Sequence, residues 1–419
     1  MSNIRKIKLD DGLTLGLIKN EKFKSNLVSV YFERNIYRSE VTALSLLSNM
    51  MVVGTKKYQN MKQVSMRLDD LYGMSMTNGV SKHGEKLLIS FKFLTISDAY
   101  LDQPIFEDVI DFVNEIVLNP LVVDSKLNPK AIDIEKENLR EEIESKINDK
   151  KAYASSKCIS LMCEGEPYAI NSSGYVEDID SISPEQMYDI YKRLVETSPI
   201  FVVVEGDFDE EYVERICREK FRFKRGNIEE IRRSNYLNKP KETRYFQEDF
   251  GNKQGKLVIG HRTNVDHQEF DKYYSLLVAN SIFGGGPHSK LFNNVREKES
   301  ICYYANSGLE KCKGLMMVNS GIDPDQYDRA LKLIRKELED VKLGNFTDLE
   351  IENAKRSIIN SMKAGYDSIS GETDFIYNQH ISRNDLTLDQ VIAYVSKVTR
   401  QDIIDVSQEV IEDTVYFLR

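Results

Sequence analysis

The side chains that most often carry catalysis or bind metals are few and scattered in this sequence. Its histidines are His83, His261, His267, His288 and His380. None follows another by three or four residues, the spacing at which two imidazoles share one helix face and can hold zinc. The five cysteines contain no C-x-x-C, and no G-x-S-x-G turn occurs. The sequence therefore gives no local support for a zinc site, a redox pair or a serine nucleophile.

The most informative pattern lies between Phe283 and Leu309. Three glycines, Gly284, Gly285 and Gly286, precede the run Leu-Phe-Asn-Asn-Val-Arg-Glu-Lys, which starts at Leu291. Glycines of this kind permit a positive φ and a close backbone approach. They do not form a phosphate-binding loop with Lys290, because no glycine immediately precedes that lysine.

This stretch resembles the C-terminal motif of the M16 peptidase family, the group of pitrilysin, insulin-degrading enzyme and mitochondrial processing peptidase. The family motif is a Gly-rich turn followed by S-R-L-F-x-x-V-R-E-K-x-G-L-x-Y. Beside the glycines, the matching residues are Ser289, Leu291, Phe292, Val295, Arg296, Glu297, Lys298 and Tyr303. Lys290 replaces the family's arginine, and Ser300 replaces its glycine. The resemblance spans nearly the whole chain and implies a tandem duplication of two α+β halves.

Active members of that family carry H-x-x-E-H ahead of a Gly-Thr landmark. The two histidines hold zinc and the glutamate polarises the zinc-bound water. The landmark is present here at Gly54-Thr55, and counting back places the window on Ser45-Leu-Leu-Ser-Asn49. Ser45 and Asn49 replace the ligands and Ser48 replaces the glutamate. Neutral Ser and Asn are poor zinc ligands, so we expect no metal or other cofactor and no catalysis by this chain alone.

The family's distal zinc ligand corresponds to Glu142, with Glu141 as the alternative register. One surviving carboxylate does not hold zinc. The simplest interpretation of Glu142 is the solvated face of a charged helix.

The resemblance also implies a role for the C-terminal motif, whose Arg and Tyr help to hold substrate in the family. That role falls on Arg296 and Tyr303, whose side chains can donate hydrogen bonds to peptide carbonyls, and it places Gly284 to Gly286 on the substrate side. The structural alternatives are that Arg296 caps a short helix, that Tyr303 packs in a strand and that the glycines only form a tight turn.

Some members of the family divide the work between two subunits, one with the zinc site and one with the Arg/Tyr pair. The resemblance thus implies a non-catalytic subunit that forms a heterodimer with a zinc-bearing M16 partner and binds peptide. The chain is also compatible with the bacterial zinc-less M16-like proteins associated with 5-aminopentanol modification of elongation factor P. The alternatives are a scaffold, as in the core subunits of the respiratory bc1 complex, and an active peptidase with an unconventional metal site.

The elements that would position these residues recur in two copies. Residues 183–203 and 399–419 align without a gap, pairing Asp189 with Asp405 and Glu196 with Glu412. Each copy reads as a Ser or Thr cap, an amphipathic helix and a short apolar strand. Each half is also expected to hold a long charged helical tract, over residues 131–151 and 348–364.

These patterns predict an α+β fold made of two homologous halves, each a largely antiparallel sheet with helices on one face. The expected boundaries are 1–224 for the N-terminal half, 225–255 for a polar linker and 256–419 for the C-terminal half. Helices are expected over 41–53, 61–71, 273–283 and 290–298, and strands over 86–94, 301–307 and 315–320.

Composition limits the remaining possibilities. The chain has 419 residues, of which 41% are hydrophobic and 30% charged, with a net charge of −10. This is ordinary globular composition, and the negative charge argues against general nucleic-acid binding. The N-terminal residues lack an apolar secretory segment and no apolar run approaches a membrane span. With so few cysteines, we expect reduced thiols, a cytoplasmic location and no membrane partner.

Overall fold

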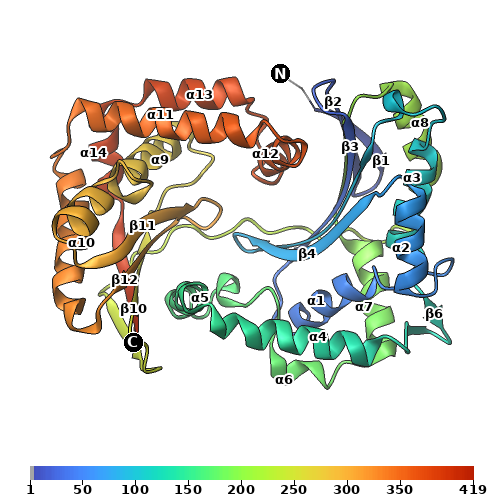
Figure 1. The fold of residues 1–419 in the computed structure, drawn as a ribbon, viewed down its shortest axis with the longest axis horizontal. Coiled ribbons are helices and arrows are strands. Elements are labelled where there is room, and N and C mark those ends of the chain that lie inside the picture. Colours follow the sequence, from blue (N-terminus) through green and yellow to red (C-terminus); the bar gives the residue numbers. More distant parts are fainter. Residues whose placement is uncertain (1–3) are drawn as a thin grey trace. The chain divides into compact units, whose positions relative to one another are not determined.

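The computed structural model describes residues 4–419, and the contacts among these residues group them into two compact units. Unit 1 comprises residues 4–144, 170–232 and 367–376, and unit 2 comprises residues 145–169, 233–366 and 377–419. Each unit therefore takes one segment from the other half of the chain. Figure 1 shows the ribbon of both units and labels many of their helices and strands.

Unit 1 is built on a six-stranded sheet in the order β1-β2-β8-β3-β5-β4. All neighbours run antiparallel except β2 and β8, which are parallel. The strands are β1 (Arg5–Asp10), β2 (Leu13–Lys19), β3 (Ser25–Asn35), β4 (Ser75–His83), β5 (Lys86–Ile96) and β8 (Ile200–Gly206), with a separate ribbon of β6 (Val122–Val123) and β7 (Lys126–Leu127). The helices are α1 (Val41–Met50), α2 (Met61–Asp70), α3 (Phe106–Leu118), α4 (Ile132–Ser145), α6 (Val176–Ile179), α7 (Pro184–Thr197) and α8 (Glu210–Lys220), with a 3-10 turn, η1 (Asp98–Tyr100).

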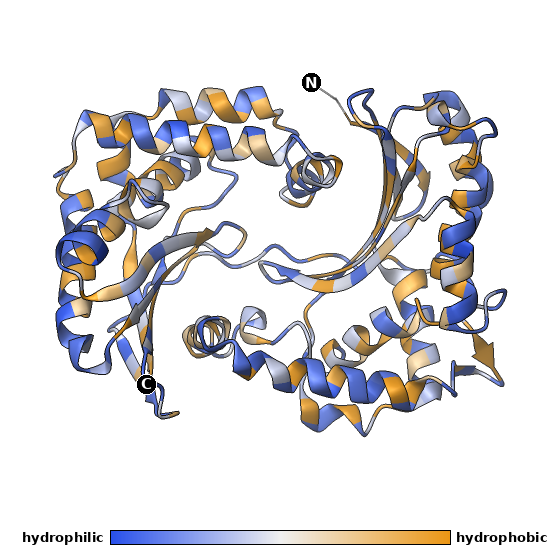
Figure 2. Ribbon diagram, viewed as in Figure 1, coloured by the Kyte–Doolittle hydropathy of each residue, from blue (hydrophilic) through white to orange (hydrophobic). Residues whose placement is uncertain are grey.

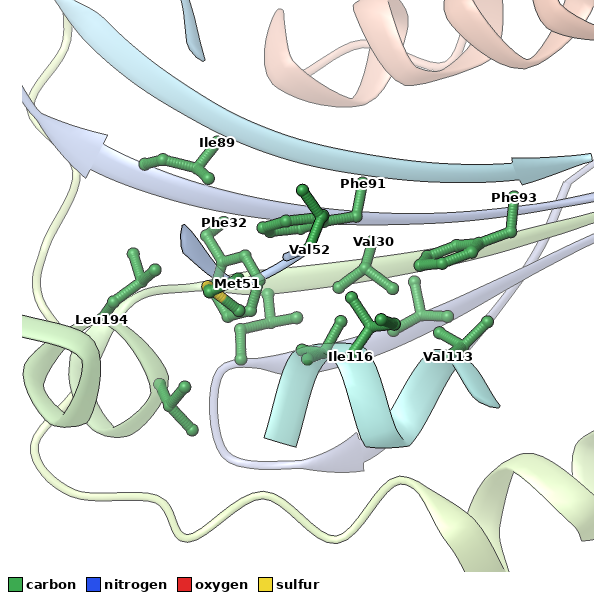
Figure 3. Packing of buried hydrophobic residues seen from close by; sticks show 14 of the residues in the cluster. Val30, Phe32, Met51, Val52, Ile89, Phe91, Phe93, Val113, Ile116 and Leu194 are labelled. Carbon is green, nitrogen blue, oxygen red and sulfur yellow. The ribbon is translucent and has the colours of Figure 1, made fainter. Parts of the chain in front are cut away.

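The core of unit 1 lies between one face of this sheet and the helices. Alternate residues of a strand point to the same face, and in β3 and β5 these positions are apolar. Figure 3 shows these side chains packed toward α3, α7 and the end of α1, with Val30, Phe32, Ile89, Phe91, Phe93, Val113, Ile116, Leu194, Met51 and Val52 labelled. The Phe32 and Phe91 rings meet edge to face at 6.3 Å. Burying each such side chain contributes roughly 1.5–3 kcal/mol.

Unit 2 is built on a five-stranded sheet in the order β11-β12-β10-β13-β9. Its strands are β9 (Arg244–Glu248), β10 (Gly255–Arg262), β11 (Cys302–Glu310), β12 (Leu315–Ile322) and β13 (Ile411–Leu418). Its helices are α5 (Lys150–Met162), α9 (Phe270–Gly284), the π-helix η4 (Leu291–Lys298), α10 (Tyr327–Lys342), α11 (Asp348–Gly365), α13 (Leu388–Lys397) and α14 (Arg400–Gln408), with 3-10 turns η2 (Lys146–Asn148), η3 (Pro167–Ala169) and η5 (Pro324–Gln326). Helix α12 (Ile369–Ile381) begins in unit 1 and ends in unit 2. Along the helices of both units hydrophobic and hydrophilic residues alternate (Figure 2), as expected of helices with one face on a sheet.

The two sheets share one topology. Unit 1 gives the order β2-β8-β3-β5-β4 and unit 2 gives β9-β13-β10-β12-β11, and in each the first pair is parallel and the remaining neighbours antiparallel. Strand β1 is the one addition, next to β2. Helices α7 and α14, which precede the equivalent strands β8 and β13, both begin with a capping box, at Ser183 and Thr399. The predicted duplication of largely antiparallel α+β halves is thus confirmed.

Each unit includes one segment from the other half of the sequence, and that segment packs on the unit's own sheet. In unit 2, Cys158 and Met162 of α5 pack with Val258 and Tyr416 of the sheet. The chain after α5 is held there by Glu166, which accepts a hydrogen bond from the buried Arg262 at 2.6 Å. In unit 1, the start of α12 docks by polar contacts, and Thr373 donates a hydrogen bond to the buried Glu205 of β8 at 2.5 Å. Glu205 alternates with the core residues Val202 and Val204, so the start of α12 lies on the sheet face opposite the core.

Three stretches differ in detail from the sequence expectation. The charged tract 131–151 is not one helix, because the Asp149 carboxylate caps a new helix by accepting from the backbone N–H groups of Lys151 and Ala152. Glu196 lies in α7 whereas Glu412 lies in β13, so the gapless alignment holds through the helices and fails at the strands. Residues 225–255 include β9, which pairs with β13. Within residues 4–419, none of the helices has the length and apolar character that a bilayer crossing requires.

Candidate functional site

The window where an M16 peptidase would carry its zinc ligands lies on α1 of unit 1. Nine of the ten residues of α1 are buried, Ser45 and Ser48 among them, and Asn49 is half-buried. The run Val-Thr-Ala-Leu-Ser-Leu-Leu explains this burial, because an apolar helix packs on several sides. The helix thus presents hydroxyl and amide groups where imidazole and carboxylate groups would be needed.

A residue of the edge strand β4 completes this window. The Asn78 side-chain nitrogen lies 3.0 Å from both the carbonyl oxygen and the Oγ of Ser48, and 3.1 Å from Oδ1 of Asn49. The two N–H groups of this amide are therefore shared among three oxygens of Ser48 and Asn49. Sequence reasoning missed Asn78, because nothing in its spacing connects it to the window.

These residues do not fit a zinc ion. The oxygens of Ser48 and Asn49 are neutral and already accept hydrogen bonds, and zinc sites are built from thiolate, imidazole and carboxylate ligands. Glu142 and its register alternative Glu141 lie on α4 and are exposed, whereas Ser45 and Ser48 are buried. Among residues 4–419, no three His, Cys, Asp or Glu side chains are grouped so that they could hold a metal. No chemical step through a metal follows from this window.

Arg296 lies on the π-helix η4 of unit 2. The helix is defined by hydrogen bonds such as Glu299 N–H to the Asn294 carbonyl, at 3.1 Å. Helices of this type are rare and occur often at functional sites. The guanidinium lies 4.7 Å from the Phe292 ring centre and 3.5 Å from a Glu297 carboxylate oxygen. About 40% of the Arg296 side chain is exposed, and in residues 4–419 it donates to no helix carbonyl, so the capping alternative is not met.

Tyr303 occupies a β-bulge in β11, an edge strand of unit 2. Cys302 pairs with Ile322 and Tyr304 pairs with Gly321, which leaves Tyr303 as the extra residue. A bulge re-aims a side chain out of the regular alternation, and Tyr303 is 57% exposed. Its hydroxyl donates to Asp323 at 2.9 Å, and this bond together with the Asp323 charge raises the pKa of Tyr303. The tyrosine is therefore a protonated, outward-facing donor and does not pack in the strand.

Ser300 stands between Arg296 and Tyr303 with a φ of +53°. This left-handed conformation suits glycine and is strained for other residues. The family motif has glycine at this position, so the structure supplies a physical reason for that preference. The Ser300 hydroxyl donates to the Glu297 carbonyl at 3.1 Å.

The three glycines form the connection between α9 and η4. None of them has a φ in the left-handed region, so the positive φ that glycine permits is not used in this turn. Gly284 is needed for close packing, because a Cβ there would lie 2.5 Å from the Ser307 Oγ of β11. A Cβ at Gly285 would meet the Ser281 backbone at 2.7 Å, whereas at Gly286 only the His288 ring is near, at 3.2 Å. Packing thus accounts for Gly284 and Gly285, and a substrate role of the run stays a prediction.

Comparison with known proteins finds a matching family model and a full-length relative. A family model described as the peptidase M16 inactive domain matches residues 181–358. A Bacillus subtilis (strain 168) protein named "Probable inactive metalloprotease YmfF" is 33% identical over 426 aligned residues, which cover 100% of this chain and 99% of that protein.

Two solved structures are similar over the full length. A conserved protein from Enterococcus faecalis V583 has 30% identity and a TM-score of 0.90, with coverage of 100% of this chain and 99% of that chain. A peptidase M16 inactive domain from Pseudomonas fluorescens has 17% identity and a TM-score of 0.83, with coverage of 99% and 98%, and is alike in fold.

Proposed function

The chain belongs to the M16 peptidase family as a member of the inactive type, and from this premise we propose that it is a non-catalytic subunit that pairs with a zinc-bearing M16 peptidase. In that pair it helps to bind the peptide substrate through Arg296 and Tyr303. The partner supplies the metal and the catalytic carboxylate, which the α1 window of this chain lacks. All five cysteines are free thiols, which supports a reducing compartment such as the cytoplasm.

The observation that carries the proposal is the exposure of Arg296 and Tyr303 on consecutive elements of unit 2. A structural arginine or tyrosine would be expected to cap a helix or fill a strand face, and neither side chain does so. The guanidinium carries five N–H donors. The phenol O–H donates to Asp323 in this structure and would exchange that partner for a peptide carbonyl on binding. A donor pair of this kind suits the carbonyl groups of an extended peptide.

The edge position of β11 supports the same conclusion. β11 has a strand neighbour, β12, on one side only. An extended peptide can add to such an edge by main-chain hydrogen bonds. Tyr303 lies in this strand and Arg296 lies on the element just before it, so both would stand beside a peptide bound there. Gly286, where little packs, would allow the peptide backbone to approach.

The test is a reconstitution with a zinc-bearing M16 partner. Cleavage of a mixed peptide library and bound zinc are measured for this chain alone, for the partner alone and for the co-purified pair. We expect zinc in the partner only and full cleavage in the pair only. The double variant Arg296→Ala with Tyr303→Phe is expected to raise KM about tenfold or more, as loss of two hydrogen bonds to substrate would.

A matched control is available in the same unit. Arg356 of α11 and Tyr245 of β9 are both exposed, so Arg356→Ala with Tyr245→Phe removes the same groups at positions outside the motif. This control is expected to leave KM unchanged. If the Arg296/Tyr303 variant also cleaves with unchanged rate and KM, or if the partner is fully active alone, the chain is a scaffold and the proposal is wrong.

A further inference from the structure

A second feature of unit 2 adjoins the proposed peptide-binding residues. The ring of Tyr304, next to Tyr303, has two lysine ammonium groups against it: Lys151 Nζ lies 4.7 Å and Lys256 Nζ lies 5.8 Å from the ring centre. Lys151 is in the first turn of α5, and Lys256 is in β10. Two ammonium groups that contact the same aromatic ring repel each other, so each disfavours the charged form of the other.

The sheet is shaped to hold the ring in this place. Gly321 of β12 pairs with Tyr304 on one side and with Lys256 on the other, so the three residues form a row across three strands. A Cβ on Gly321 would lie 2.4 Å from the Tyr304 ring. The glycine therefore lets the tyrosine lie flat across β12 toward Lys256.

The positive charge of this row is not neutralised by ion pairs. Among residues 4–419, no carboxylate lies within ion-pair distance of either ammonium, and Lys256 donates instead to the neutral side chain of Gln254. Asp149 is the nearby acid, and its carboxylate is already bonded to two backbone N–H groups of α5. The pKa of Lys256 is lowered by burial and by the charge of Lys151, although Asp149 opposes the shift. A bound anion would relieve this repulsion.

We propose that Lys151, Tyr304 and Lys256 form a subsite for a carboxylate of the bound peptide, supplied by an acidic side chain or by the peptide's C-terminus. The proposal rests on the proposed function, because it concerns a peptide held at β11. Tyr303 and Tyr304 face the same short stretch of β12 and the residue after it, Gly321 to Asp323. A peptide that reaches Tyr303 thus lies beside Tyr304, whose ring the two lysine ammonium groups contact. The subsite gives this subunit a preference for acidic peptides.

The test compares peptides that differ only in charge. Three fluorescent twelve-residue pools of otherwise identical composition are used: one with Gln and blocked ends, one with Glu at the same positions and blocked ends, and one with Gln and a free C-terminal carboxylate. Binding to the full chain, alone and in the co-purified pair stripped of zinc so that no peptide is cleaved, is measured by anisotropy at low salt. We expect the wild type to bind a carboxylate pool about tenfold more tightly than the blocked Gln pool. This preference should weaken with added salt.

Two lysine variants test whether the preference for carboxylate peptides comes from Lys151 and Lys256. Lys151→Gln with Lys256→Gln is expected to abolish it and to keep the affinity for the blocked Gln pool. Lys150→Gln is the matched control, because the Lys150 ammonium lies over Phe250 and not over Tyr304, and it should retain the preference. Equal wild-type affinities for all three pools would overturn the subsite and leave the proposed function standing. Failure of every pool to bind would contradict both proposals.

Discussion

Ser300, in the candidate site, has a strained backbone conformation that a hydrogen bond of its own side chain partly offsets. It has a left-handed backbone where the family has glycine, and it joins the helix of Arg296 to the strand of Tyr303. A non-glycine residue in this conformation costs about 1 kcal/mol or more. The hydrogen bond from its hydroxyl to the Glu297 carbonyl offsets part of that cost.

We therefore expect Ser300→Gly to stabilise the protein by about 0.5–1 kcal/mol, because relief of the strained φ exceeds the loss of one exposed hydrogen bond and the added freedom of the unfolded chain. The urea midpoint measures this change. Ser300→Ala is the control, since it removes the hydroxyl and keeps the strain, and it should destabilise. A Ser300→Gly variant less stable than the wild type would show that the hydroxyl matters more than the backbone.

At the same scale, the sequence reveals some site residues and conceals others. Arg296 and Tyr303 stand in a contiguous motif, and their exposure agrees with the role implied for them. Asn78, which fills the former zinc window, comes from a strand some thirty positions away and depends on the fold of the sheet. The bulge at Tyr303 and its bond to Asp323 depend on strand register, which no local pattern encodes.

At the scale of elements, the predictable parts are those with a local cause. Helices α7 and α14 have the expected N-caps, Ser183 and Thr399, because a capping box involves only residues close together in sequence. The helix expected over 290–298 is present at 291–298, but neither its π-type hydrogen bonding nor the break at Asp149 was predicted. In the first case no local sequence pattern distinguishes hydrogen bonds to the fifth preceding residue from those to the fourth. In the second a side-chain cap competes with continuation of the helix.

The start of α12 carries a pH-dependent contact with β8. The Asn20 side-chain amide donates to Glu372 at 2.8 Å and lies 3.4 Å from Glu205, so two buried carboxyl groups share one amide. The charged side chains around them are Lys22 and the ion pair of Lys92 with Asp374. Burial and the charge of Glu372 raise the pKa of Glu205 to about 8, against the opposing hydrogen bonds from Thr373 and Asn20. The folded protein thus keeps a proton that the unfolded chain releases near pH 4.5.

Because the folded-state pKa is raised, the wild type should lose stability as pH rises from about 4.5 to 8 and show no further loss from this group above 8. At about 1.4 kcal/mol per pKa unit, a shift of this size corresponds to a loss of several kcal/mol. Glu205→Gln removes the titrating group and keeps one acceptor oxygen for Asn20 or Thr373, so its melting temperature should fall less between pH 5.5 and pH 8.5. Glu211→Gln, at an exposed position of α8, is the control. Parallel pH profiles for wild type and Glu205→Gln would contradict this assignment.

At the scale of the whole molecule, the exchange of segments decides how the halves of the chain depend on each other. Residues 145–169 belong to unit 2 although they precede most of it in sequence, and residues 367–376 belong to unit 1. The duplication was visible in the sequence as a repeat, because helix caps and apolar periods are local. The exchange of segments was not visible, because the apolar face of α5 is compatible with packing on either sheet and its sequence pattern does not say which.

The exchange predicts that a cut chain stays together. Lys241 and Glu242 are exposed and lie outside any helix or strand, so a protease site inserted there separates a fragment that holds α5 from one that holds α12. We expect the cleaved fragments to co-elute in native gel filtration and to separate only in denaturant, because each fragment supplies a segment buried in the other's sheet. Expressed alone, fragment 1–241 should aggregate, since Ala154, Cys158 and Met162, which are buried in unit 2, would lose their partners and expose apolar surface. Two fragments that elute separately, each with a cooperative melt, would mean that the units fold without the exchanged segments.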